Sequence, residues 1–308
     1  MNKPRRAPRR RVDGVLLLDK PTGMTSNAAL QKARWLFNAE KAGHTGTLDP
    51  LATGLLPLCF GEATKFAGEL LDADKSYRAT LQLGVTTDSA DSDGNILLTR
   101  PVEVDADKWR TAMTDFRGAI DQVPPMHSAL KRDGKPLYEY ARQGIELPRE
   151  ARRITIYRLE LVSFSGDEAV IDVDCSKGTY VRTLAADLGE ALGCGAHLTA
   201  LRRTRIGRLD VADAISLEQL EALASADRDA RLSQVDMLLA DVPIASLNPS
   251  EVERVTHGQG IRWEGVPGSR KRLYAPEGRF LGLAEQSADG WLNPRRMVVT
   301  DPGPAENG

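Results

Sequence analysis

Gly43-His44-Thr45-Gly46-Thr47-Leu48-Asp49-Pro50-Leu51-Ala52-Thr53-Gly54 is the stretch that constrains the fold and chemistry of this chain most. It sets one carboxylate and one imidazole among glycines, which allow backbone conformations and close approaches that other residues resist. Asp is a favoured N-cap and Pro suits the first helical position, so Asp49-Pro50 predicts a helix start, with Leu51, Leu55 and Leu56 as a buried stripe. Two interpretations stay open: Asp49 only caps that helix, or it belongs to a functional site.

Length and composition indicate an ordinary globular protein. The 308 residues, 41% hydrophobic and 27% charged, predict one large domain and a smaller one. The sequence has no apolar run long enough to span a bilayer, and its basic N-terminus lacks the apolar core of a secretory signal, so we expect a cytoplasmic protein without membrane contact. The three cysteines, Cys59, Cys175 and Cys194, show no CxxC spacing, and we expect buried thiols rather than disulfides or a zinc site.

Charge is distributed unevenly along the chain. The net charge is -2, yet six of the 41 basic residues lie in residues 1–12, which leaves 35 basic against 43 acidic residues elsewhere, or -8. Residues 1–12 therefore predict a disordered basic arm on an acidic body. Local basic clusters, rather than net charge, determine phosphate binding. They occur at Arg149, Arg152 and Arg153, at Arg202, Arg203, Arg205 and Arg208, at Arg270, Lys271 and Arg272, and at Arg295 and Arg296.

Hydrophobic periodicity predicts an α+β protein with a mixed, largely antiparallel sheet covered by helices. The expected elements are a buried strand at 15–18, a helix over 27–38, a strand over 77–83, a helix over 104–116, strands over 154–164 and 169–175, and helices over 180–192 and 217–238. Residues 86–95 form an acidic, turn-rich segment without the downstream Glu of a calcium loop, so we interpret them as a plain loop. Short apolar runs separated by Gly and Pro beyond residue 245 predict a small β domain.

Five motifs in register resemble one known family. They are residues 43–54, Leu18-Asp19-Lys20-Pro21-Thr22-Gly23-Met24-Thr25-Ser26, Lys75-Ser76-Tyr77-Arg78-Ala79, Pro124-Pro125-Met126-His127-Ser128-Ala129-Leu130-Lys131, and Gly178-Thr179-Tyr180-Val181-Arg182-Thr183-Leu184. This series is similar to the tRNA pseudouridine synthases of the bacterial TruB type, which modify the T-loop uridine. The resemblance implies a pseudouridine synthase fold over residues 13–243 and, more weakly through His257-Gly258-Gln259-Gly260-Ile261, a barrel-like RNA-binding domain of the PUA type over 245–303.

The resemblance also implies roles for individual residues. Asp49 is the catalytic carboxylate, with addition to the base, attack on the sugar and deprotonation of the sugar as open routes. Arg182 is the cation that keeps it ionised. Tyr77, counted with them as catalytic, also binds the flipped uridine together with Tyr180 and Leu201. Two assignments go beyond these five. His44 stacks on neighbouring bases in the gap left in the RNA loop, with a phosphate contact as the open alternative, and Lys20 supports the catalytic loop and faces the pocket.

The expected partner is tRNA, bound at its T arm by the catalytic domain and at its acceptor stem by the C-terminal domain. The chain contains no P-loop, dinucleotide fingerprint or metal-ligand motif, so we expect neither a cofactor nor a metal. We expect a monomer. Two alternatives stay open: a noncatalytic RNA-binding or RNA-folding protein, which would not require Asp49, and a related synthase in a guide-RNA complex, against which the short chain without a long basic tail counts.

Overall fold

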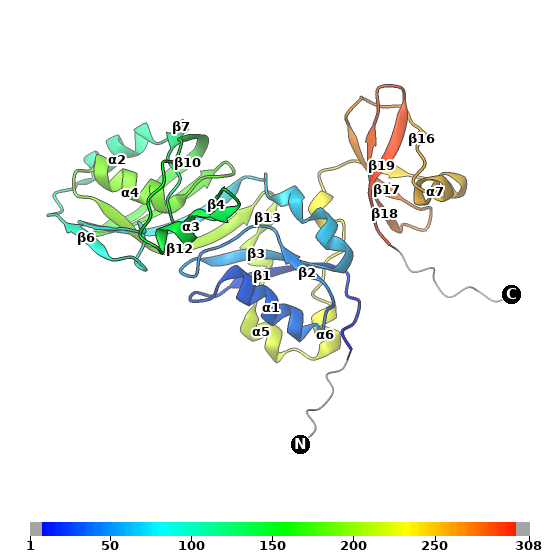
Figure 1. The fold of residues 1–308 in the computed structure, drawn as a ribbon, viewed down its shortest axis with the longest axis horizontal. Helices are drawn as coiled ribbons and strands as arrows, with labels where there is room; N and C mark the ends of the chain where they lie inside the picture. Colours follow the sequence, from blue (N-terminus) through cyan, green and yellow to red (C-terminus); the bar gives the residue numbers. More distant parts are fainter. Residues whose placement is uncertain (1–7, 300–308) are drawn as a thin grey trace, which may run out of the picture.

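The computed structural model describes residues 8–299, which form a large part built on a ten-stranded sheet and a small C-terminal part built on a five-stranded sheet (Figure 1). Most strand pairs are antiparallel, and the exceptions in the large sheet are β1 with β14 and β3 with β12. The predicted class, an α+β fold with a mixed, largely antiparallel sheet and covering helices, is confirmed. The strands of the large sheet, in spatial order, are β14 (Ile215–Ser216), β1 (Gly14–Lys20), β3 (Thr53–Phe60), β12 (Ala196–Ile206), β4 (Lys75–Leu83), β11 (Glu168–Cys175), β10 (Arg152–Ser165) and β7 (Gly118–Gln122), with β2 (Ala42–His44) beside β3 and β13 (Leu209–Asp210) beside β12.

The helix predicted to start at Asp49-Pro50 is wrong, because the residues after it form strand β3. Leu55 and Cys59 of this strand pack on one face of the sheet, whereas Leu56 and Leu58 pack on the other. A strand buried on both faces is continuously apolar, and such a short run cannot be distinguished from a buried helix by periodicity.

Helices cover the large sheet on both faces near β1 and β3. The helices of the large part are α1 (Ser26–Leu36), α2 (Ala106–Asp115), α3 (Leu137–Ala141), α4 (Val181–Ala191), α5 (Leu217–Ala222) and α6 (Ser225–Asp229), with 3-10 helices η1 (Gly61–Leu70), η2 (Val211–Asp213) and η3 (Met237–Leu239). Buried residues of α1, α2, α4 and α5 share one core, and η1 with η3 packs on the opposite face. The single helix predicted over 217–238 is wrong: α5 stops at Ala222 because Leu223 and Ala224 are extended.

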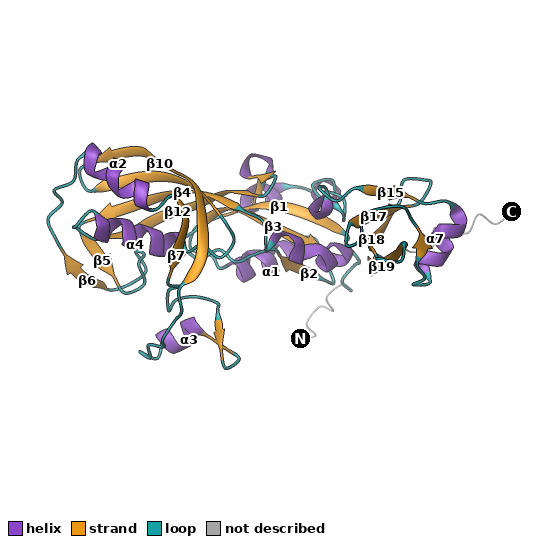
Figure 2. Ribbon diagram, turned by 90° about the horizontal axis from the view of Figure 1, so that it is seen from above, coloured by secondary structure: helices purple, strands orange, loops and turns teal. Residues whose placement is uncertain are grey.

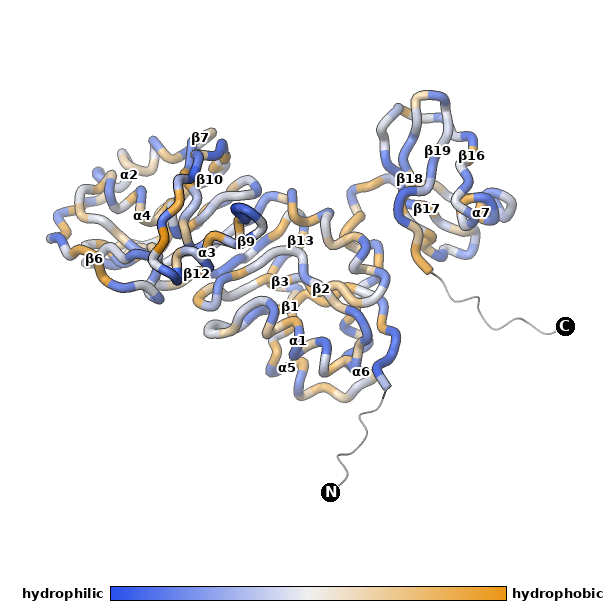
Figure 3. Tube along the Cα trace, in the orientation of Figure 1, coloured by the Kyte–Doolittle hydropathy of each residue, from blue (hydrophilic) through white to orange (hydrophobic). Residues whose placement is uncertain are grey.

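One segment projects from the large part. Figure 2 shows α3 lying away from the body of the sheet, next to the short hairpin of β8 (Lys131–Arg132) and β9 (Lys135–Pro136), and Figure 3 shows that hairpin as strongly hydrophilic. A second hairpin pairs β5 (Val85–Thr87) with β6 (Ile96–Thr99), and turns connect them, as expected for the acidic loop. Both insertions border the cleft described below.

The C-terminal sheet forms its own small core and docks on η1. Its strands, in order, are β15 (Ile244–Ser246), β17 (Arg270–Tyr274), β18 (Phe280–Gln286), β19 (Trp291–Met297) and β16 (Ile261–Arg262), with helix α7 (Pro249–Thr256) beside them. The ring of Phe280 meets that of Phe66 edge-on at 5.7 Å between centroids, and Arg270 pairs with Glu69 at 2.8 Å. These contacts orient the small part relative to the large one.

The N-terminal arm falls mostly outside the described residues, but the expected disorder does not extend to Arg10, whose amide donates to the carbonyl of Asn38 at 2.8 Å and whose guanidinium pairs with Asp229. The three cysteines are buried free thiols, as predicted. Within residues 8–299, no helix is long and apolar enough to cross a bilayer.

Candidate active site

Asp49 lies in the loop between β2 and β3, and the backbone on both sides of it is anchored. The hydroxyl of Ser26 accepts a hydrogen bond from the amide of Leu48 at 2.7 Å and donates to the carbonyl of the same residue at 3.0 Å. The amide of Gly23 donates to the carbonyl of Pro50 at 2.8 Å. Asp49 is therefore presented from a fixed backbone without needing a helix behind it.

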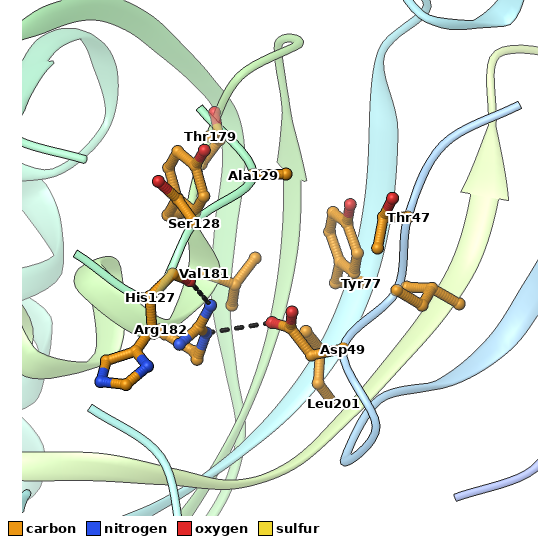
Figure 4. A pocket seen from close by; sticks show the side chains of 12 residues that line it. Thr47, Asp49, Tyr77, His127, Ser128, Ala129, Thr179, Val181, Arg182 and Leu201 are labelled. Carbon is orange, nitrogen blue, oxygen red and sulfur yellow. Dashed lines mark hydrogen bonds and ion pairs between the residues drawn. The ribbon is translucent and has the colours of Figure 1, made fainter. Parts of the chain in front are cut away.

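Arg182, the second residue of α4, pairs with Asp49 (Figure 4) and also with a second carboxylate, that of Asp91. Its Nε lies 3.1 Å from Oδ2 of Asp49, and its Nη1 lies 3.3 Å from Oδ2 of Asp91. The same guanidinium donates to the carbonyls of Ser89 at 3.1 Å and His127 at 2.7 Å. The Arg182 side chain is only 6% exposed while that of Asp49 is 43% exposed, so the cation is fixed in the protein and the carboxylate faces the solvent space.

That space is a pocket of about 210 Å³, smaller than a typical drug-sized ligand site and suited to one small flat group. Its lining residues come from the Asp49 loop, β4, the segment before β8, the start of α4, and β12 (Figure 4). They are Thr47, Leu48, Asp49, Tyr77, His127, Ser128, Ala129, Thr179, Tyr180, Val181, Arg182 and Leu201. Five of the residues predicted from sequence meet here: Asp49, Tyr77, Tyr180, Arg182 and Leu201.

The two tyrosines are held as neutral phenols. Burial raises the pKa of Tyr77, against the opposing charge of Arg203, and burial also raises the pKa of Tyr180. The backbone of Tyr180 is fixed by the amide side chain of Gln122, which donates to its carbonyl at 3.1 Å and accepts from its N–H at 2.8 Å. Neutral aromatic rings beside the aliphatic side chain of Leu201 give the pocket apolar faces, opposite the charged Asp49 and Arg182.

His44 lies outside the inner pocket, in a larger adjoining cleft of about 740 Å³. Asp49 and Arg182 line both spaces, and the cleft continues along the start of α1, the acidic loop and α3. Burial, with the charge of Arg203, lowers the pKa of His44. A neutral imidazole at this place is suited to stacking on a base rather than to a charge contact with phosphate.

Lys20 does not line either space, so the expectation that it faces the pocket is wrong. Its side chain is buried behind the loop, and its Nζ donates to the carbonyls of Pro21 at 2.9 Å, Met24 at 2.6 Å and Pro50 at 3.4 Å. The backbone turns after β1 and around Pro50 present these carbonyls to the ammonium, and this draws it inward. Its support of the catalytic loop is therefore made through backbone carbonyls.

Sequence reasoning missed several residues of the site. Asp91 lies in the segment interpreted as a plain loop, and nothing in the local pattern distinguishes its carboxylate from those of its acidic neighbours. Ser128 lies in a quoted motif, and its buried hydroxyl faces the pocket without a hydrogen-bond partner among the described residues. Gln122 and Arg203 are distant in sequence from the motifs they hold, so only the fold identifies them.

The arrangement can hold a flat base between apolar and aromatic groups and place it against a carboxylate that is paired with Arg182. Such a carboxylate can act as nucleophile or as base. Among residues 8–299, no cluster of three or more His, Cys, Asp or Glu side chains is placed to hold a metal ion.

Family models cover nearly the whole described chain. Residues 34–181 match the TruB family pseudouridylate synthase N-terminal domain, residues 182–244 the tRNA pseudouridylate synthase B C-terminal domain, and residues 243–298 the C-terminal domain of pseudouridine synthase II TruB.

Curated relatives and solved structures agree with these matches. A protein of Azoarcus sp. (strain BH72) named tRNA pseudouridine synthase B is 58% identical over 97% of this chain and 99% of its own. A Chromobacterium violaceum protein of the same name is 56% identical over 97% and 98%. Among solved structures, a chain of a Cbf5-Nop10-Gar1 complex is 27% identical with a TM-score of 0.68 over 94% of this chain and 84% of that one. A chain of an H/ACA RNP bound to a substrate RNA has a TM-score of 0.69 at 24% identity, over 93% of this chain and 85% of that one, which shows a shared fold.

Proposed function

The chain belongs to the TruB family of pseudouridylate synthases, and we propose that its target is the T-loop uridine of tRNA, position 55 in tRNA numbering. It is a tRNA pseudouridine synthase, an isomerase of tRNA processing. The observation that carries the proposal is the ion pair of Asp49 and Arg182 at 3.1 Å, on the wall of a pocket sized for one base.

The reaction converts uridine into its C-linked isomer without net loss or gain of atoms. The bond from N1 of the base to C1′ of the ribose breaks, the base turns, and a bond forms between C5 and C1′, while the hydrogen on C5 is released as a proton and N1 gains one. We propose that the carboxylate of Asp49 starts this sequence as nucleophile or base, with Arg182 keeping it ionised and oriented. Its three routes, addition to the base, attack on the sugar and deprotonation of the sugar, share this requirement.

The remaining pocket residues are proposed to hold the flipped base. Tyr77 stacks on its flat face next to the reacting atoms, and Leu201 closes the pocket as an apolar wall. Tyr180 supplies a second aromatic contact at the start of α4. His44, in the outer cleft, then fills the gap that the flipped base leaves in the RNA loop by stacking on neighbouring bases.

We propose that residues 13–243 carry out this chemistry on the T arm and that residues 245–303 bind the same RNA elsewhere, at its acceptor stem. Support comes from the exposed Arg295 and Arg296 on β19, whose charges suit phosphate contacts. We further propose that the protein acts as a monomer, and in the cytoplasm, where bacterial tRNA is matured.

A noncatalytic RNA-binding protein is the alternative of a different class. It could use the same basic surface, but it would not need a carboxylate held against a buried guanidinium beside a base-sized pocket. Membership of a guide-RNA complex is disfavoured because the relatives at 55–58% identity are named as tRNA enzymes.

The test is release of tritium from a tRNA transcript labelled at uridine C5. We expect the native protein to release tritium, and we expect Asp49→Asn to lower the rate of release by about 10⁴-fold or more. A transcript whose T-loop uridine is replaced by cytidine should release no tritium from that site. Tight tRNA binding without release by the native protein would establish the noncatalytic alternative. Undiminished release from the cytidine transcript would mean a different target uridine.

A further inference from the structure

Arg203 is a fully buried cation on β12 that the chemistry above does not use. Its side chain is among the largest that are buried in the protein, with 2% of the residue exposed. It stands between Gly54 of β3 and Tyr77 of β4 in the strand register. Within the described range, residues 8–299, no carboxylate oxygen lies within 4.0 Å of its guanidinium. A buried charge without a counter-ion is costly, so its hydrogen bonds must account for its place.

Those hydrogen bonds all go to backbone carbonyls around the catalytic loop. Nε donates to the carbonyl of Leu55 at 2.8 Å, Nη2 to that of Gly46 at 3.3 Å, and Nη1 to that of Thr47 at 3.5 Å. Gly46 and Thr47 lie just before Asp49, and Leu55 lies on β3, after it. The guanidinium thus joins the two arms of the loop that carries the carboxylate.

The other points of the loop are held by different groups. Lys20 bonds the carbonyl of Pro50, and the hydroxyl of Ser26 bonds Leu48. Arg203 therefore holds the carbonyls of the incoming arm, residues 46 and 47, while the amide of Gly46 donates to Nδ1 of His44 at 3.4 Å. Its planar fork reaches three carbonyls at once, a geometry that the single ammonium of a lysine cannot reproduce.

Arg203 also acts on the ring of Tyr77. Tyr77 is opposite Arg203 in the pairing of β4 with β12, and the positive charge opposes the rise that burial causes in the pKa of Tyr77. Arg203 thus bonds the loop that presents Asp49 and is the cross-strand neighbour of the residue whose ring is proposed to stack on the base.

We propose that Arg203 is a positioning residue for the isomerisation: its fork aligns the Asp49 loop with Tyr77, so that the carboxylate and the stacked base meet in reacting geometry. It touches no substrate, since it lines neither the inner pocket nor the outer cleft. This inference rests on the proposed function.

The test compares Arg203→Lys with a matched control, Arg228→Lys. Arg228 also donates to three carbonyls, those of Leu220 at 2.9 Å, Leu36 at 3.1 Å and Glu221 at 2.9 Å, but it lies on α6, away from the pocket. Both variants lose a guanidinium fork and keep a positive charge. Any difference in activity between them therefore reports on position in the molecule rather than on the loss of such a fork.

We expect Arg203→Lys to lower kcat by about 100-fold, because misplacement by about 1 Å costs that much, while KM and the Kd for tRNA stay within about twofold. Arg228→Lys should keep kcat within about twofold. Thermal unfolding of both variants shows whether they fold, and Arg203→Gln offers a second route if the lysine variant does not.

Two results would overturn the inference. An unchanged kcat in a folded Arg203→Lys protein, with only a lowered Tm, would make Arg203 purely structural. A loss confined to KM or Kd would make it an RNA-binding residue instead. Failure of the native protein to release tritium from the T-loop uridine would count against the proposed function, not against the position of Arg203.

Discussion

Arg182 pairs with two carboxylates of the site, those of Asp49 and Asp91. It is buried against Asp91, whose side chain is also 6% exposed, so removing the guanidinium leaves a carboxylate buried without its partner. We expect Arg182→Met to lower the free energy of unfolding by about 3 kcal/mol and to abolish tritium release. Urea denaturation checks the first effect. The control is Arg78→Met: its side chain is 54% exposed in the pair with Asp172, and the pair should contribute less than about 1 kcal/mol. Equal losses in the two variants would contradict this account.

Lys20 predicts a pH dependence of stability. Burial is the main reason that its pKa falls from an ordinary value of 10.5 to about 8; Asp49 opposes the fall and Arg203 adds to it. Between these two pH values the unfolded chain holds a proton that the folded protein has released, so stability rises with pH across this window. Below about pH 8 both states are protonated, and the cost of burying the charge is fully present.

We therefore expect the free energy of unfolding of the native protein, relative to Lys20→Met, to increase as the pH rises from 8 towards 10.5. Guanidinium denaturation at several pH values in this range measures the slope. Lys108→Met, at an exposed position on α2, controls for the general change in net charge. If the difference in the free energy of unfolding between the native protein and Lys20→Met does not change with pH over this window, the ammonium is not destabilised by burial.

At the level of elements, the parallel contact of β3 with β12 determines how closely the catalytic loop approaches Arg203. Gly54 has a φ of +98°, and a Cβ built there would lie 2.3 Å from the carbonyl oxygen of Arg203. Backbone cannot move aside as a flexible side chain can. The absence of a Cβ is thus what allows these two strands to pair.

Gly54→Ala should therefore cost about 3 kcal/mol or more, since it adds strain at a positive φ to a backbone clash. Gly68→Ala, on η1 with no heavy atom within 4 Å of the added Cβ, should change stability by less than about 1 kcal/mol. Chemical denaturation of the two variants side by side makes the comparison. A Gly54→Ala protein as stable as Gly68→Ala would mean that the two strands separate easily.

At the scale of the whole molecule, the contacts of Phe280 with Phe66 and of Arg270 with Glu69 orient the C-terminal sheet relative to the large part. If residues 245–303 bind outside the T arm, charge reversal at Arg295 and Arg296 should raise KM for whole tRNA by about tenfold or more, with kcat unchanged. The same double variant should leave KM for an isolated T-arm stem-loop unaltered. Tritium release on both RNAs over a range of salt concentrations gives the comparison. An equal rise in KM for both RNAs would place these arginines on the T arm.

Several features of this protein could be predicted from the sequence because they depend on local chemistry. Hydrophobic patterns predict four of the strands, at 15–18, 77–83, 154–164 and 169–175, which correspond to β1, β4, β10 and β11. They also predict the helices at 27–38, 104–116 and 180–192, which correspond to α1, α2 and α4. The motifs predict Asp49, Tyr77, Tyr180 and Arg182, the family resemblance adds Leu201, and all five line one pocket. The first four belong to short segments whose residue types are themselves distinctive.

The tertiary structure alone decided what depends on distant partners. A run buried on both faces has no periodicity, so the sequence predicts a helix where the structure has β3, which lies between β1 and β12. Lys20 turns away from the pocket because carbonyls brought together by two separate loops surround its ammonium. Only the tertiary fold brings Asp91 to Arg182 and Arg203 to the Asp49 loop. The geometry of a buried charge is determined by groups far away in sequence.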